Sequence, residues 1–151
     1  MKVTLNGRNG PVETYALCDG GSTQSWMAPS LKKKLELSGK EVSLNLQSFT
    51  GTENVITEEL PVDIVIPSEA KTETVNVLVK PDFSIGSDKL NLSALKRKYP
   101  CLKNKPEDYL DYSSVRLLLG QTAFHLIRHL EYKYDELIIQ VSAVIFCRSS
   151  A

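Results

Sequence analysis

A short apolar strand that runs into a carboxylate and two glycines constrains this chain more than any other feature. Residues 15–18 are apolar enough for a buried strand, and Asp19, Gly20 and Gly21 follow directly. Glycine lets the backbone turn sharply and lets a second backbone approach closely. No lysine or arginine lies within several residues of Asp19. A carboxylate placed at such a turn is a candidate catalytic group, although the tripeptide alone is also compatible with an ordinary surface turn.

A second apolar strand that ends in glycine lies far downstream. It comprises Val115–Leu119 and is closed by Gly120. Many core strands end in glycine, so this pattern is weak by itself. Its position after the Asp-Gly-Gly turn gives it weight.

Together the two motifs resemble the signature of retropepsin-type aspartic peptidases. The chain is most similar to the peptidase domain of Pao-type (BEL/Pao) retrotransposon polyproteins, from about residue 3 to residue 134. The shared features are an Ala-Leu-hydrophobic-Asp motif, a Pro-Ser before a short helix, a leucine-rich insertion ending in Tyr-Pro, and a Leu-Leu-Gly run followed by His-Leu. In this chain they are residues 16–22, Pro29-Ser30, residues 92–100, residues 118–122 and His129-Leu130.

The resemblance implies an all-β, retropepsin-like acid protease barrel with one or two short helices and one lobe per chain. It implies an aspartic endopeptidase that processes a retroelement polyprotein, or a domesticated derivative of one. The site residues are then catalytic Asp19, the active-site loop residues Gly20, Gly21 and Ser22, and the supporting residues Leu118, Leu119 and Gly120.

The chemistry of such a site predicts a homodimer. Aspartic peptidases use two carboxylates that share one proton, because like charges at hydrogen-bonding distance do not both ionise. The ionised carboxylate activates a water as a general base, and the protonated one polarises the scissile carbonyl. Asp19 is the only aspartate in the chain that precedes a glycine. The second Asp19 must therefore come from a second copy, with a polypeptide as substrate.

Residues 48–55 are predicted to form a flap. A hairpin tip with a glycine can close over a substrate and exclude water. A plain hairpin turn is the alternative. The flap residues are Phe49, Thr50, Gly51 and Thr52.

Two features depart from the family. The position after the catalytic aspartate is normally Ser or Thr, whose hydroxyl locks the two active-site loops together, and Gly20 has no hydroxyl to do so. The domain is expected to span residues 1–134, whereas residues 135–151 match nothing in the family. We expect residues 136–147, which are apolar and β-prone, to pair as a strand at the subunit interface.

Composition excludes several other classes. A chain of 151 residues is large enough for one domain with a sizeable core. Its formal net charge of zero gives no steering toward nucleic acid or an anionic membrane. Three cysteines without a Cys-x-x-Cys, and only two histidines, favour neither disulfides nor a metal site, and no cofactor is expected. The start has no secretory pattern, so a cytoplasmic or retroelement-particle location is expected.

The remaining pattern is of many short strands with few helices, which favours a barrel. Ser30 is a possible cap of the first helix. The predicted strands are 3–5, 13–18, 42–47, 55–56, 60–66, 74–79 and 115–119, and the predicted helices are 30–37, 90–98 and 122–128.

Two alternatives of other classes remain open. The chain could be a catalytically inactive retropepsin fold used for dimerisation or peptide binding, which Gly20 and the unmatched tail favour. It could also be a small β-barrel binding domain unrelated to peptidases. A hydrolase built on Ser22 is disfavoured because the chain has no Gly-x-Ser-x-Gly elbow.

Overall fold

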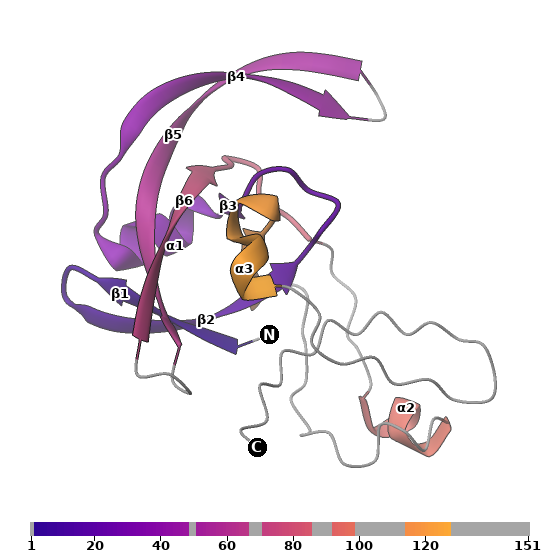
Figure 1. Cartoon of the computed structure of the whole chain (residues 1–151). Helices are drawn as coiled ribbons and strands as arrows, with labels where there is room; N and C mark the ends of the chain where they lie inside the picture. Colours follow the sequence, from indigo (N-terminus) through magenta and orange to yellow (C-terminus); the bar gives the residue numbers. More distant parts are fainter. Residues whose placement is uncertain (1, 49–50, 67–70, 86–91, 99–113, 128–151) are drawn as a thin grey trace.

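The fold is known from a computed structural model that describes residues 2–48, 51–66, 71–85, 92–98 and 114–127. It is an all-β barrel with a few short helices (Figure 1), which confirms the fold class expected from the sequence. The strands are β1 (Lys2–Gly7), β2 (Gly10–Cys18), β3 (Trp26–Met27), β4 (Lys40–Ser48), β5 (Gly51–Ile66), β6 (Lys71–Val79) and β7 (Val115–Leu119). The helices are α1 (Pro29–Leu35), α2 (Leu92–Lys98), α3 (Phe124–Ile127) and the 3₁₀ turn η4 (Gln121–Ala123).

Six strands close the barrel. The order around it is β1-β2-β7-β3-β6-β5, and β1 pairs back onto β5 with Leu5 opposite Ile64. Two of the contacts are parallel, β2 with β7 and β3 with β6, while β3 runs antiparallel to β7. The parallel contact between β2 and β7 matters most here, because it brings the ends of two strands that are distant in sequence to the same place.

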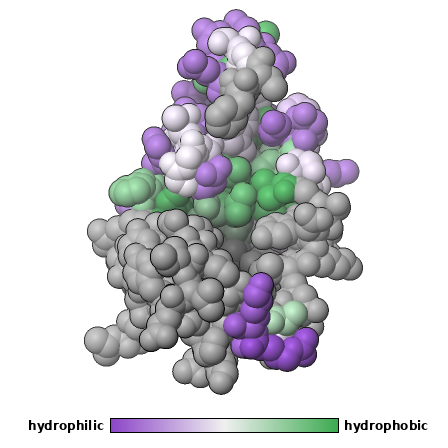
Figure 2. All heavy atoms as spheres, turned by 90° about the vertical axis from the view of Figure 1, so that its right-hand side faces the viewer, coloured by the Kyte–Doolittle hydropathy of each residue, from purple (hydrophilic) through white to green (hydrophobic). Residues whose placement is uncertain are grey.

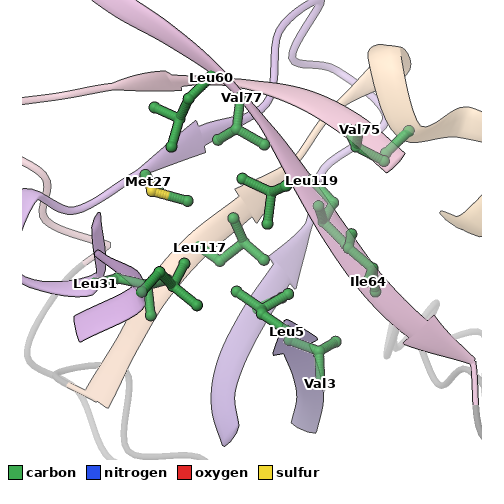
Figure 3. Packing of buried hydrophobic residues seen from close by; sticks show 14 of the residues in the cluster. Val3, Leu5, Met27, Leu31, Leu60, Ile64, Val75, Val77, Leu117 and Leu119 are labelled. Carbon is green, nitrogen blue, oxygen red and sulfur yellow. The ribbon is translucent and has the colours of Figure 1, made fainter. Parts of the chain in front are cut away.

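The barrel is filled by aliphatic side chains. Along β7 the residues alternate between buried and half-buried, with Leu117 and Leu119 almost fully buried. They meet Leu5 from β1 and Leu60 from β5 in the centre of the barrel (Figure 3). This alternation is the period of a strand with one face on the core, and it fixes which residue of β7 faces inward.

Helix α1 packs against the core of the barrel. Leu31 and Leu35 are its buried residues. The predicted cap at Ser30 is wrong: Ala28 occupies the cap position without a side-chain hydrogen bond, and Pro29 begins the helix. Proline suits this first position because its fixed φ is helical and its missing N–H has no partner there in any case.

Strand β5 continues past the barrel. Its residues from Glu59 onward pair with β6, whereas residues 51–58 pair only with β4 among the described strands. We call residues 40–48 and 51–58 the arm. The arm curves outward and reaches over the side of the barrel where the loop between β2 and β3 lies (Figure 1).

The predicted strands all occur, with two differences. Residues 55–66 form one uninterrupted strand rather than two, because the pairing with β4 continues directly into the pairing with β6. Strand β3 was missed, since two residues carry no periodicity. The domain boundary at 134, the tail strand at 136–147, and flap residues Phe49 and Thr50 lie outside the described residues.

None of the helices within the described part of the chain is both long and apolar enough to cross a lipid bilayer.

Candidate active site

Asp19 and Gly120 lie side by side at the ends of two parallel strands. In the register of β2 with β7, Cys18 is opposite Leu119, so the residues that follow are neighbours. The amide of Asp19 donates a 2.9 Å hydrogen bond to the carbonyl of Leu119, which extends the pairing beyond the strand. The two motifs that stand far apart in sequence therefore build one site.

The Asp19 carboxylate is oriented by its own loop. Its Oδ1 accepts a 2.9 Å hydrogen bond from the amide of Gly21, and its carbonyl accepts one of 3.2 Å from the amide of Ser22. A carboxylate that binds the backbone two residues on forms an Asx-turn. A Cβ on Gly21 would lie only 3.2 Å from Oδ1, so this glycine lets the carboxylate sit close to the backbone. Asp19 is half-buried, and the carboxylate thus combines a fixed orientation with access to solvent.

Gly120 is required by close packing. A Cβ at this position would lie 2.2 Å from the carbonyl oxygen of Gln24 and 2.6 Å from that of Ser22. Real Cβ atoms do not approach so near, so the loop can cross the end of β7 only where a glycine stands. The amide of the next residue, Gln121, donates a 2.8 Å hydrogen bond to the Ser22 carbonyl and fastens this crossing.

A buried hydroxyl pair joins the same two segments. Ser25 is fully buried, and its Oγ accepts a 3.0 Å hydrogen bond from the amide of Gly120. The same Oγ lies 2.7 Å from Oγ1 of Thr122. Sequence analysis gave neither residue a role, although Thr122 ends the second motif, because a Ser before a two-residue strand and a Thr in a turn carry no pattern that specifies this bond.

Gly20 is open to solvent. Nothing lies within 4 Å of the position that a Cβ would take, so a side chain would fit in this chain. The carbonyl of Gly20 accepts a 3.1 Å hydrogen bond from Nε2 of Gln121. The loop is therefore tied to the Gly120 turn by a glutamine that belongs to the second motif but to which sequence analysis gave no role.

Leu118 and Leu119 lie at the end of β7, next to the Asp19 loop. Leu119 is buried in the core, whereas Leu118 is half-buried between Leu17 on β2 and Trp26 on β3, its partners in the sheet. Both leucines lie where the second motif was expected to place them. Trp26 is half-buried in the sheet next to them.

The arm overhangs this side of the molecule. Its tip pairs Ser48 with Gly51, whose φ of 134° is strained for other residues. Along β4, half-buried residues alternate with exposed ones, and the half-buried face is apolar and carries Val42, Leu44 and Leu46. Val55 of β5 lies opposite Leu44 and is also half-buried, whereas residues 51–54 are exposed. Seen from the loop side, a band of apolar surface crosses the molecule below the polar outer part of the arm (Figure 2).

Ion pairing anchors the base of the arm. Glu58 pairs with Lys32 of α1 and accepts a 2.6 Å hydrogen bond from the amide of Gly39. The hydrogen bond from Lys32, followed by that from Gly39, lowers the pKa of the Glu58 carboxyl. The arm is thus fixed to α1 at its root.

Cys18 is unsuited to nucleophilic chemistry despite its position beside Asp19. Burial raises the pKa of its thiol to about 11, so the reactive thiolate is scarce at neutral pH. Within the described ranges, no cluster of three His, Cys, Asp or Glu side chains could hold a metal ion. Among the described residues of this site, Asp19 is the candidate for acid–base chemistry.

Comparisons with known proteins identify no family. No family model matches the chain, and no curated protein matches it either. Among solved structures, the chain is similar to a protein of unknown function (DUF785) from Legionella pneumophila subsp. pneumophila str. Philadelphia 1. The two are 10% identical with a TM-score of 0.36, over 82% of this chain and 83% of the other. A likeness this slight carries no functional argument.

Proposed function

We propose that the chain is the subunit of a homodimeric aspartic endopeptidase, with Asp19 as the catalytic residue of each subunit. The observation that carries the proposal is the crossing of the Asp19 loop over Gly120. It presents an oriented, half-exposed carboxylate at the joined ends of β2 and β7. The resemblance of both motifs to those of Pao-type retroelement peptidases supports polyprotein processing, or a domesticated derivative of it, as the role.

The mechanism needs a two-fold axis between two copies of Asp19. With the carboxylates in contact, two negative charges repel each other, so the pair would share one proton. The ionised Asp19 removes a proton from a water, which attacks the scissile carbonyl. The protonated Asp19 donates a hydrogen bond to that carbonyl and then supplies a proton to the leaving nitrogen.

The arm supplies the second requirement of this chemistry, which is shelter from water. Its apolar face carries Leu44, Leu46 and Val55, and its tip at Gly51 extends beyond the barrel. We assign the arm as the flap that covers an extended polypeptide.

The test is cleavage of a peptide library by the full chain at mildly acidic pH, with and without a pepstatin-type inhibitor. Asp19→Asn removes the titratable carboxyl but keeps its shape, and it should abolish cleavage without changing the fold. Asp63→Asn is the matched control: this residue lies on β5 and accepts a 2.6 Å hydrogen bond from Thr74, which asparagine can also accept. Activity that survives in Asp19→Asn would refute the assignment.

Gly20 favours a second candidate, a catalytically inactive module that dimerises or binds peptides. It has no hydroxyl with which to brace a partner's loop. If the parent chain binds extended peptides and sediments as a dimer but cleaves nothing under any condition of the library experiment, this second function replaces the first.

A further inference from the structure

The loop that carries Asp19 is braced by side chains of its own subunit. Ser25 is central because it is fully buried and touches two other segments. Its Oγ accepts a hydrogen bond from the amide of Gly120, and its carbonyl accepts a 2.9 Å hydrogen bond from the amide of Leu78 on β6. One serine thus joins the end of the Asp19 loop to the Gly120 turn and to the barrel wall.

The chemistry of the hydroxyl explains why Thr122 stands beside it. A hydroxyl has one donor and two acceptor positions. The Gly120 amide can only donate, so it occupies one lone pair of Ser25 Oγ. The 2.7 Å contact with Thr122 Oγ1 then orients the hydroxyl. Thr122 is exposed, so it can be replaced without opening the core.

Gln121 acts at the other end of the loop. Its backbone amide holds the Ser22 carbonyl, and its Nε2 holds the Gly20 carbonyl next to the catalytic aspartate. Residues 121 and 122 therefore brace both ends of the segment from Gly20 to Ser25, and no part of this bracing needs a partner's hydroxyl.

We propose that Ser25, oriented by Thr122, and Gln121 are positioning residues that hold the Asp19 carboxylate from within the subunit. This inference rests on the proposed peptidase function. In the family that the motifs resemble, the hydroxyl of the residue after the aspartate helps to hold the active-site loop. Gly20 has no hydroxyl, and we assign part of this role to Ser25, Thr122 and Gln121. A shift of the loop by even an ångström would misplace the carboxylate relative to the attacked carbonyl.

The kinetic test compares Ser25→Ala, Thr122→Val and Gln121→Leu with the parent, using kcat per site titrated with a tight-binding inhibitor. Ser25→Ala should lower kcat by about tenfold and change KM by less than about twofold, because the groups that contact substrate remain. Thr122→Ser keeps the hydroxyl and should have the kcat of the parent, whereas Thr122→Val should have a lower kcat. Thr74→Val is the control, since it removes an exposed hydroxyl from β6, away from the loop.

A second readout separates positioning from stability and from the proposed function. The Asp19 carboxyl is titrated by carbon NMR in each variant, and its titration should shift in Ser25→Ala, Thr122→Val and Gln121→Leu but not in Thr74→Val. Unchanged kcat per titrated site, or an Asp19 titration identical to that of the parent, would overturn the positioning role. If Ser25→Ala does not fold, the comparison of Thr122→Val with Thr122→Ser tests the positioning role instead. A parent that cleaves nothing refutes the peptidase function alone, because the titration still tests the bracing.

Discussion

The amide of Asp19 donates its hydrogen bond to the carbonyl of Leu119 at 2.9 Å, although a hundred residues separate the two in the chain. The bond continues the parallel pairing of β2 with β7 by one residue past the end of β2. Any displacement of the end of β7 is therefore transmitted directly to the candidate catalytic residue. The glycine that follows Leu119 is the natural place to probe this relationship.

Gly120→Ala should destabilise the protein strongly. The new methyl group would overlap the carbonyl oxygens of Gln24 and Ser22, and both belong to backbone that must then move. We expect a loss of about 1–3 kcal/mol or more in the free energy of unfolding, measured by urea denaturation. Gly20→Ala is the matched control, because nothing lies within 4 Å of its Cβ, and it should change stability by less than about 0.5 kcal/mol. Equal losses in the two variants would contradict the close packing at Gly120.

Gly20→Ser and Gly20→Thr should strengthen the proposed dimer. The chain has room for either side chain, and a hydroxyl there could bond across the two-fold axis, with each bond contributing about 1 kcal/mol net. Sedimentation should show a lower dissociation constant, and turnover should rise. Gly20→Ala adds the Cβ without the hydroxyl, so a gain of the same size in that variant would show that the hydroxyl is not responsible.

Hydrogen exchange should reveal the arm as a moving cover. The amides of Gly51 and Thr52 lie at its tip, where the strands pair only with each other among the described residues. Such segments open at low free energy, so their exchange should be fast in the free protein. A pepstatin-type inhibitor should slow it markedly. The amide of Val62, within the part of β5 that pairs with β6, should exchange slowly in both states and serves as the reference. Equal exchange rates of the tip amides with and without the inhibitor would contradict the flap role.

Acid should weaken the root of the arm through Glu58. Its pKa is lower in the folded protein than its ordinary value of 4.5, because Lys32 and the Gly39 amide favour the ionised form. Its contribution to stability is therefore complete above the pKa of the unfolded chain and is lost as pH falls through the lowered folded value. Glu58→Gln should flatten the fall in stability below about pH 4.5. Glu53→Gln, an exposed position nearer the tip, should leave that slope unchanged; a slope that Glu58→Gln also leaves unchanged would contradict the anchor.

The strands of the barrel were predictable because their residues alternate or form apolar runs of strand length. Val115–Leu119 was predicted to the residue, and Asp19 follows its strand as expected. The resemblance assigned Asp19 and Gly120 to one site, but their adjacency was not predicted, since no local pattern specifies which distant strands pair. The structure supplies the physical reason: the steric demand at Gly120 and the parallel register of β2 with β7.

The polar braces of the site were beyond sequence reasoning. Ser25, Gln121 and Thr122 act through bonds between segments about a hundred residues apart, and each is an ordinary loop residue in its own neighbourhood. The cap at Ser30 failed for a related reason. A favourable residue type was present, but the proline before it had already fixed where the helix begins.

Strand β5 runs from the arm into the barrel as one continuous strand. It extends from Gly51 at the tip to Ile66, and its second half is one of the six strands that close the barrel. A movement of the tip is therefore transmitted through β5 to the strands of the barrel, because no loop interrupts β5 between the two. A ligand bound beneath the arm would consequently rigidify the whole barrel, and its binding would raise the melting temperature of the entire domain.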